Sequence, residues 1–455
     1  MKLSVVGLGK LGSPLAAILA SKGHQVTGID FNQELTKKIN EGIAPFHEPQ
    51  LQELLDEHGS NLQATTEYET AILDSEITFI IVPTPSDQDG LFTNRYILQS
   101  LETIGAALKK KKGYHLVVIT STVMPGSTSG EIQTTLEKAS ARKVGEDLGL
   151  CYNPEFIALG SVVRDMLFPD MILIGESDAK AGNMLQKIYE GFCENAPPIE
   201  RMKPVNAELT KLSLNTYVTT KISYANMLGN ICESLPGSDV DVVTQAIGLD
   251  SRIGRKYLKA AVAFGGPCFP RDNVAFRAMA EGLNARVDLA NATQRVNDFQ
   301  PERLENLIKK YGKGKRIGIL GLSYKPGTYV VEESAGVKIA NRLSQAGYDV
   351  SVYDPMALSE AKRILDTKVR AASTLQDCLK SSDMVLIMTN WPEFAESITP
   401  EAMEEAGSCT LIIDCWRALK KEAFTKVCKV IYLGQGLLET EEESKELLTA
   451  AAGKY

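Results

Sequence analysis

Short apolar runs alternate with longer helical patterns over the first two hundred residues. The apolar runs cover residues 3–6, 26–29, 77–82, 116–119, 148–152 and 171–174. Near-continuous apolar runs of this length are typical of buried parallel strands. The segments between them are long enough for helices, so the pattern predicts a doubly wound α/β sheet made of parallel strands.

The pattern then changes and later resumes. Residues 205–235 contain no glycine or proline except Gly229, and their apolar positions follow helical spacing; at 1.5 Å per residue they predict one helix of roughly 45 Å. Helical spacing continues to about residue 310, and strand-like runs return at 316–320, 350–353, 384–388 and 411–413. We therefore expect an α/β fold with two Rossmann-like doubly wound domains, 1–200 and 311–455, joined by a helical central domain, 201–310, with one long helix. The charged tail after residue 439 is expected to fray.

A glycine-rich turn follows the first predicted strand. Gly7-x-Gly9-x-x-Gly12 precedes a helical pattern, and Asp30 closes the second strand. The first glycine suits the tight turn, the second lets a pyrophosphate approach the backbone, and the third lets helix and strand pack closely. A carboxylate at the second strand end accepts hydrogen bonds from a ribose and repels a 2′-phosphate, which favours NAD over NADP. The alternative is a tight structural turn. The candidate cofactor residues here are Gly7, Leu8, Gly9, Lys10, Leu11, Gly12 and Asp30.

Two further loops follow predicted strands. They contain Pro83, Thr84 and Pro85 in one case, and Ser121 and Thr122 in the other. Because the carboxyl ends of parallel strands form the ligand-binding edge of such sheets, both loops are candidates for the same site. Each one alone is equally consistent with an ordinary loop.

The most unusual local sequence is Phe264-Gly265-Gly266-Pro267-Cys268-Phe269-Pro270-Arg271-Asp272. Cysteine in a glycine-rich loop is a candidate nucleophile if its thiolate is stabilised, with Arg271 as a nearby cation and Asp272 as a possible base. The alternative for any single cysteine is a small buried hydrophobic residue.

Other residues add to this chemistry. Glu155 follows a predicted strand, and Lys211 and Asn215 lie four positions apart on one face of the long helix. A lysine and an asparagine side by side can stabilise an oxyanion. We interpret Glu208, one turn before Lys211, as a member of a surface ion pair of little energetic value.

Composition narrows the classes of function. The 455 residues carry 49 basic and 57 acidic side chains, a net charge of −8, with 44% hydrophobic and 23% charged residues. These values are ordinary for a globular chain and argue against nucleic acid or an anionic membrane as partner. We expect no membrane-spanning helix, no signal peptide and a cytoplasmic location. Eight cysteines without a Cys-x-x-Cys pair predict reduced thiols, and four histidines without ligand spacing predict no metal site.

These motifs together resemble the UDP-glucose/GDP-mannose dehydrogenase family of nucleotide-sugar dehydrogenases. The resemblance extends from Gly7 to about Arg417. It rests on the glycine turn, Ser121-Thr122-Val123, Asn153-Pro154-Glu155-Phe156, Ala207-Glu208-Leu209-x-Lys211-Leu212, the Cys268 loop and Gly321-Leu322-Ser323-Tyr324-Lys325.

The resemblance implies a four-electron oxidation of the sugar C6 hydroxyl with two NAD⁺, through a thiohemiacetal and a thioester on Cys268. It implies that Lys211 and Asn215 hold oxyanions, that Glu155 and Asp272 share proton transfer and water activation, and that Thr122 lies near the nicotinamide. It further implies a homodimer formed through the long helix. The implied substrate-binding residues are Phe156, Lys211, Asn215, Arg252, Tyr257, Lys259, Phe264, Gly265 and Lys325.

The substrate prediction is UDP-glucose, giving UDP-glucuronate, with other UDP- or GDP-hexoses as alternatives, including UDP-N-acetylhexosamines and GDP-mannose. The sequence departs from the family's usual pattern at Glu332, where the family usually has arginine, and at Arg271, where lysine is common. The third region, with Gly318-x-x-Gly321 only, lacks the full fingerprint, so we assign it the nucleotide diphosphate rather than NAD. Two other classes of function stay open: a two-electron hydroxyacid-type dehydrogenase, and a non-catalytic binder of sugar nucleotides.

Overall fold

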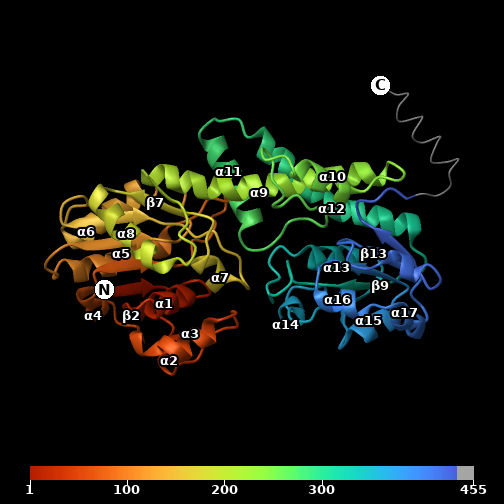
Figure 1. Ribbon diagram of the computed structural model, residues 1–455, viewed down its shortest axis with the longest axis horizontal. Helices are drawn as coiled ribbons and strands as arrows, with labels where there is room; N and C mark the ends of the chain where they lie inside the picture. The colour runs from red at the N-terminus through yellow and green to blue at the C-terminus, as the bar shows by residue number, and fades with distance from the viewer. Residues whose placement is uncertain (438–455) are drawn as a thin grey trace. The chain divides into compact units, whose positions relative to one another are not determined.

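The computed structural model describes residues 1–437 and divides into two compact units (Figure 1). The first unit is Met1–Leu214, and the second begins at Asn215. The boundary lies inside the long helix α9 (Pro204–Glu233), so each unit holds part of that helix.

The first unit contains an eight-stranded sheet with the order β3-β2-β1-β4-β5-β6-β7-β8. Its strands are β1 (Lys2–Val6), β2 (Gln25–Ile29), β3 (Leu62–Thr65), β4 (Ile77–Ile80), β5 (His115–Ile119), β6 (Leu148–Tyr152), β7 (Ile172–Glu176) and β8 (Ile199–Met202). All neighbouring pairs are parallel except β6 and β7, which are antiparallel. The strand expected at 171–174 is present as β7 and is parallel to β8. The expectation that it runs parallel to the preceding strands is wrong, because it pairs antiparallel with β6 and strand composition does not encode direction.

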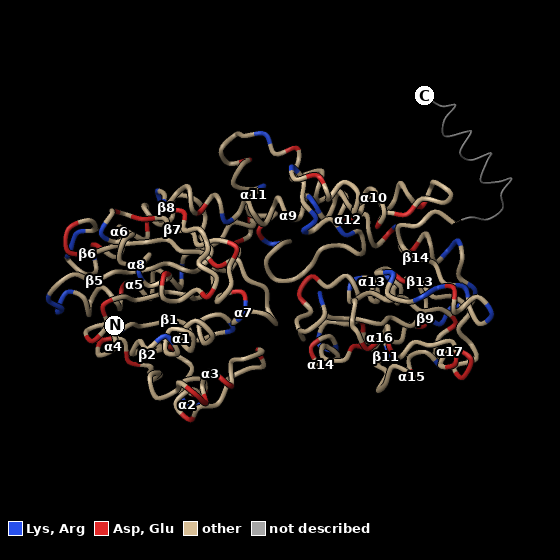
Figure 2. The backbone as a smooth tube through the Cα atoms, viewed as in Figure 1, with Lys and Arg blue, Asp and Glu red and all other residues tan. Residues whose placement is uncertain are grey.

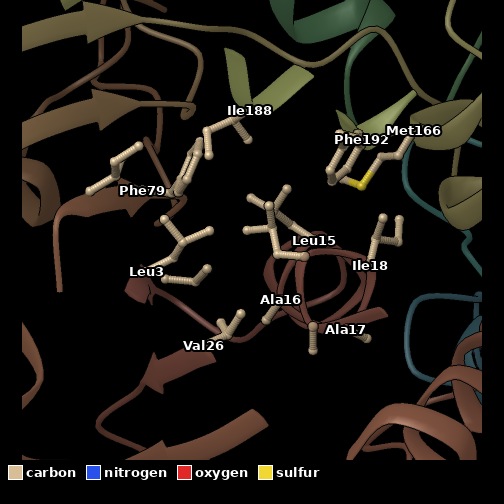
Figure 3. Close-up of a cluster of buried hydrophobic side chains, with 14 of the residues drawn as sticks. Leu3, Leu15, Ala16, Ala17, Ile18, Val26, Phe79, Met166, Ile188 and Phe192 are labelled. Carbon is tan, nitrogen blue, oxygen red and sulfur yellow. The ribbon is translucent and has the colours of Figure 1, made fainter. Parts of the chain in front are cut away.

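Helices cover both faces of this sheet. They are α1 (Gly12–Ser21), α2 (Gln33–Asn40), α3 (Leu51–His58), α4 (Tyr68–Asp74), α5 (Arg95–Leu108), α6 (Gln133–Ser140), α7 (Val162–Leu167) and α8 (Ala179–Phe192), with short turns η1 (Gly59–Asn61) and η2 (Thr128–Ile132). On one face, α1, α7 and α8 pack on Leu3 and Phe79 (Figure 3). On the other face, α4, α5 and α6 pack on Val6 and Ile80. Alternate residues of each strand thus feed opposite cores, which explains the near-continuous apolar runs.

The second unit contains a six-stranded, wholly parallel sheet with the order β11-β10-β9-β12-β13-β14. Its strands are β9 (Arg316–Leu320), β10 (Asp349–Tyr353), β11 (Arg370–Ala371), β12 (Met384–Ile387), β13 (Leu411–Asp414) and β14 (Lys429–Tyr432). Its other elements are α10 (Val240–Gly248), α11 (Phe269–Gly282), α12 (Asp288–Tyr311), α13 (Ala335–Gln345), α14 (Leu358–Ala361), α15 (Leu375–Lys380), α16 (Pro392–Ser397), α17 (Pro400–Ala406) and η3 (Lys421–Phe424).

The predicted fold class is confirmed: two doubly wound sheets and a helical middle with one long helix. Helix α9 begins at Pro204, whose fixed φ and missing N–H suit a first turn. In both sheets the strand order changes direction beside β1 or β9, which is where such folds bind ligands.

No helix among residues 1–437 is both long and apolar enough to cross a membrane. Acidic and basic residues are mixed along both units (Figure 2). The predicted fraying of the tail after residue 439 concerns a segment outside the described residues.

Candidate functional site

The glycine turn of the first unit has the packing that its spacing predicts. Gly7 has a φ of +93°, and a Cβ on it would lie 2.5 Å from the Ile81 carbonyl oxygen. A Cβ on Gly12 would lie 1.8 Å from the Gly7 carbonyl oxygen. Gly9, by contrast, is exposed and a Cβ there would meet nothing within 4 Å. Protein packing therefore requires Gly7 and Gly12, whereas Gly9 leaves an open approach to the backbone.

The elements around this turn fit a dinucleotide. Helix α1 starts directly after it, and no side-chain hydrogen bond caps its N-terminus, so the positive end of the helix dipole suits a pyrophosphate. The Asp30 carboxylate accepts from the N–H of Leu8 at 2.8 Å and of Asn32 at 2.9 Å, and it stays only half-buried. Two lone pairs engaged by the backbone leave others for a ribose hydroxyl. Lys10 and Leu11 are half-buried in the turn.

The loops after β4 and β5 are joined to each other. The Ser121 hydroxyl accepts from the Val82 N–H at 2.9 Å and donates to the Val82 carbonyl at 2.7 Å. The Thr84 hydroxyl donates to the Thr122 carbonyl at 2.7 Å. These bonds bring the two predicted cofactor loops together at one sheet edge, with Pro83 exposed and Pro85 half-buried beside them.

Glu208 is not the surface residue that we expected. Its side chain on α9 is completely buried, and its two carboxylate oxygens accept from the N–H groups of Gly126 at 2.6 Å and Thr128 at 2.7 Å. The prediction of a surface ion pair is wrong because the partners are backbone groups about eighty positions earlier in the chain. Glu208 therefore fixes the loop that begins at Thr122.

Glu155 and Lys211 lie together in the first unit. The Lys211 ammonium donates to the Glu155 carbonyl oxygen and lies 4.9 Å from the Phe156 ring centre. Burial raises the pKa of the Glu155 carboxyl to about 7, while the positive charge of Lys211 acts in the opposite direction. A carboxyl with a pKa near neutrality can both accept and release a proton at physiological pH.

The Cys268 loop lies in the second unit. Cys268 is exposed and occupies the N-cap position of α11, at the positive end of the helix dipole. Asp272, one turn later, is buried, and its carboxylate accepts from the Asn215 side-chain amide at 2.6 Å. Arg271 approaches the same carboxylate at 3.8 Å. The structure thus brings Asn215, Asp272 and the Cys268 turn together.

The other predicted substrate residues also lie in the second unit. Arg252 pairs with Asp250 of its own loop, with bonds of 2.9 and 2.6 Å, and stays strongly exposed. The Lys259 ammonium lies 5.8 Å from the Trp416 ring centre, and that of Lys325 lies 5.9 Å from the Tyr324 ring centre.

Tyr257 is exposed and packs edge-on against Phe269, with ring centres 6.2 Å apart. Phe264 is buried and Gly265 half-buried in the Cys268 loop. In the described part of the chain, no cluster of three His, Cys, Asp or Glu residues is arranged to hold a metal ion.

The second sheet has a similar pair of closely packed glycines, separated by a longer stretch of chain than in the first unit. Gly321, with a φ of +102°, follows β9, and a Cβ on Gly336 would lie 2.1 Å from the Gly321 carbonyl oxygen. Gly336 therefore occupies the place that Gly12 has in the first unit. Residues 322–335, including Lys325, form the connection between them. Because this connection is long, Gly336 does not fit the Gly-x-Gly-x-x-Gly spacing and cannot be recognised from it.

The acidic residue of the second sheet is enclosed, unlike Asp30. Asp354 is 2% exposed, and one of its oxygens accepts from the N–H of Leu322 at 2.7 Å and of Ser323 at 2.9 Å. Its second oxygen accepts from the backbone N–H groups of Met356 and Ala357. The indole N–H of Trp391 donates to the first oxygen at 3.2 Å. No comparable access for a ribose hydroxyl exists at this carboxylate.

The sequence matches the UDP-glucose/GDP-mannose dehydrogenase family in three segments: its NAD binding domain at residues 1–193, its central domain at 205–299 and its UDP binding domain at 318–421. A UDP-glucose 6-dehydrogenase of Haloferax volcanii is 39% identical over 400 residues, 87% of this chain and 92% of that protein. A GDP-mannose 6-dehydrogenase of Pseudomonas aeruginosa is 33% identical over 407 residues, 86% and 92% of the two chains. The solved structure of a UDP-glucose dehydrogenase from Pyrobaculum islandicum matches with a TM-score of 0.84 and 33% identity, covering 95% of this chain and 96% of that one.

Proposed function

The chain belongs to the UDP-glucose/GDP-mannose dehydrogenase family and is an NAD-dependent nucleotide-sugar dehydrogenase, and from this we propose that it oxidises the C6 hydroxyl of UDP-glucose to a carboxylate. The observation that carries the chemistry is the Cys268 turn, where an exposed thiol at a helix N-terminus lies one turn from the Asn215–Asp272 pair.

The first unit holds the cofactor in this proposal. The turn at Gly9 and the N-terminus of α1 receive the pyrophosphate, Asp30 receives the adenosine ribose, and Thr122 borders the nicotinamide. Bound NAD⁺ supplies a hydride acceptor, and a four-electron oxidation consumes two molecules in succession. The negative charge of Asp30 disfavours NADP.

Cys268 retains the intermediate. After C6 loses its first hydride and the hydroxyl proton, the thiol sulfur bonds to the aldehyde carbon and the carbonyl oxygen takes up a proton, giving a thiohemiacetal. This adduct still carries the C–H bond that the second hydride transfer needs. Loss of that hydride and of the hydroxyl proton gives a thioester, and water then cleaves the carbon–sulfur bond to release the carboxylate and restore the thiol.

Four side chains assist these steps. Lys211 and Asn215 stabilise negative oxygen, and one such donor is typically worth about 3 kcal/mol of transition-state stabilisation. Glu155, whose pKa is raised to about 7, is suited to exchange protons with substrate or water. Asp272, held by Asn215 at 2.6 Å, is the second carboxylate available for this task.

The nucleotide is assigned to the second unit. Phe264, Gly265, Tyr257, Lys259 and Lys325 bind the nucleotide sugar in this proposal. The enclosed Asp354 supports this assignment over a second NAD site. The 39% identity to the UDP-glucose 6-dehydrogenase of Haloferax volcanii makes UDP-glucose the first substrate to test, and the 33% identity to the GDP-mannose 6-dehydrogenase of Pseudomonas aeruginosa makes GDP-mannose the second.

The homodimer is also part of the proposal. Within the second unit, α9 carries the exposed side chains of Tyr217, Tyr224 and Ile231, spaced seven positions apart, with Met227 beside them. Such an apolar stripe fits a second copy of the same helix. Arg252, exposed on its loop, is the residue offered across that contact. Sedimentation of the wild-type and Tyr224→Glu proteins tests this, since the dimer should dissociate on substitution.

The central experiment measures NADH and acid with Cys268→Ser. Wild-type enzyme should release two NADH per acid from UDP-glucose, and Cys268→Ser should form almost no acid. Cys428→Ser, a substitution of a buried cysteine in the second unit, is the control. A ratio of one NADH per oxidised sugar in the wild type would refute the covalent scheme. Parallel assays with GDP-mannose and UDP-N-acetylhexosamines test the substrate.

A further inference from the structure

The segment that leads to Cys268 has neither helix nor strand to hold it. It runs from the end of α10 at Gly248 to the start of α11 at Phe269. Ala260, Ala261 and Phe264 within it are nevertheless buried. Buried backbone N–H and C=O groups require partners, so these residues depend on bonds from outside the segment.

Asn297 of α12 supplies one pair of bonds. Its side-chain oxygen accepts from the Phe264 N–H at 2.7 Å, and its side-chain amide donates to the Phe264 carbonyl at 3.3 Å. Asn297 is buried, so no water competes for these positions. Two bonds to the N–H and C=O of one residue fix both its position and the orientation of its peptide groups.

Asn226 of α9 supplies a second pair. Its oxygen accepts from the Ala261 N–H at 2.8 Å, and its amide donates to the Val262 carbonyl at 3.1 Å. The helix and the segment approach closely here, because a Cβ on Gly229 would lie 3.2 Å from the Ala260 Cβ. Asn226 is completely buried.

Further contacts hold the segment before and after residues 261–264. The Arg417 guanidinium donates to the Ala260 carbonyl at 2.7 Å, and the Gly266 N–H donates to the Glu332 carbonyl at 3.0 Å. A Cβ on Gly265 would lie 2.3 Å from the Glu333 carbonyl oxygen, so the backbones touch. Gly266 lies two residues before Cys268, a reach of about 7 Å at most. On the other side of that short stretch, the Cys268 carbonyl accepts from the Asp272 N–H at 2.8 Å at the start of α11.

We propose that Asn226 and Asn297 are positioning residues that hold the Cys268 sulfur at its working place through the backbone of residues 261–264. Neither asparagine reaches the thiol itself; each acts by fixing the path of the loop. The inference rests on the proposed role of Cys268 as the nucleophile. Because a misplacement of about 1 Å at a reacting atom costs up to about 100-fold in rate, small shifts of this loop should be visible in kcat.

The test compares Asn226→Ala and Asn297→Ala with Asn341→Ala. Asn341 makes the same kind of two-bond attachment to a different loop. Its side-chain amide donates to the Ile364 carbonyl at 3.1 Å, and its side-chain oxygen accepts from the Asp366 N–H at 2.7 Å. The assays are steady-state kinetics with UDP-glucose and NAD⁺, and amide hydrogen exchange of the intact protein.

We expect kcat to fall about 10- to 100-fold in Asn226→Ala and Asn297→Ala, with the KM for NAD⁺ within about twofold of wild type. The KM for UDP-glucose should rise as well, because Phe264 and Gly265 of the same segment belong to the proposed sugar-nucleotide site. Amides of residues 261–266 should exchange faster in these two variants, and Asn341→Ala should match wild type in both respects. If Asn297→Ala does not fold, Asn297→Asp replaces it, since it keeps the side-chain shape and the acceptor for Phe264 N–H.

Three results would overturn the proposal: unchanged kcat despite faster exchange at 261–266, loss of kcat without faster exchange there, or an equal loss in Asn341→Ala. These are separable from failure of the proposed function. If Cys268→Ser retains acid formation, the nucleophile assignment fails whatever the asparagine variants do. If Cys268→Ser is inactive and the asparagine variants have wild-type kcat, only the positioning role fails.

Discussion

Glu208 gives the sharpest structural prediction, because its carboxylate is fully buried and both of its oxygens accept backbone N–H bonds from the loop after Thr122. Glu208→Gln keeps the shape of the side chain but turns one acceptor into a donor, which then faces an N–H. One charge-assisted hydrogen bond is lost, worth about 1.5–3 kcal/mol, and a buried N–H is left without a partner. We expect the free energy of opening this loop to be about 2–3 kcal/mol lower in Glu208→Gln than in the wild type. The open state should then be about 30- to 140-fold more populated.

Amide hydrogen exchange followed by mass spectrometry measures this opening directly, in peptides that cover Gly126 and Thr128. Glu200→Gln, an exposed glutamate of β8, is the matched control and should exchange as wild type does. The KM for NAD⁺ should rise in Glu208→Gln, because the loop that it fixes begins at Thr122. Unchanged exchange at Gly126 and Thr128 would show that the carboxylate does not hold this loop.

Three further predictions concern the first unit. Gly12→Ala should prevent stable folding, since its Cβ would lie 1.8 Å from the Gly7 carbonyl oxygen, whereas Gly9→Ala should fold normally by circular dichroism and bind NAD⁺ more weakly. Asp30→Asn keeps an acceptor for the Leu8 N–H but loses the charge, so the preference for NAD⁺ over NADP⁺, measured as a ratio of kcat/KM, should fall by about tenfold or more. Burial raises the Glu155 pKa from 4.5 to about 7, so the folded state binds more protons than the unfolded state and stability should decrease as pH rises through this window. Urea titrations at pH 4.5 to 8 should show a decrease of at most about 3 kcal/mol that Glu155→Gln abolishes; equal slopes in the two proteins would contradict the raised pKa.

The strands that periodicity missed have a common property. The four-residue β3 and the two-residue β11 lie at the edges of their sheets, as do β8 and β14. Edge strands are short and carry polar residues on their open side, so they lack the continuous apolar run of a central strand. The same reasoning explains why the central strands β1, β9 and β12 were predicted to within a residue.

The roles that sequence reasoning missed or misjudged belong to residues whose hydrogen-bond partners are distant along the chain. Glu208, Asn226 and Asn297 each look like an ordinary polar residue of a helix. Their bonds go to backbone groups 33 to 82 positions away. No local spacing predicts such a bond, since the backbone of a loop has no residue signature.

Hydrophobic periodicity and the backbone freedom of glycine act over a few neighbouring residues, so they specify the two wound sheets, the long helix and the glycine turn. Three features came from packing across the whole chain: the reversed direction of β7 and β8, the open carboxylate of Asp30 against the enclosed one of Asp354, and the asparagine side-chain bonds to the Cys268 loop. Each of these features depends on contacts between groups that are far apart in the sequence. Such contacts, and the exclusion of water from them, arise only when the chain packs into its tertiary structure.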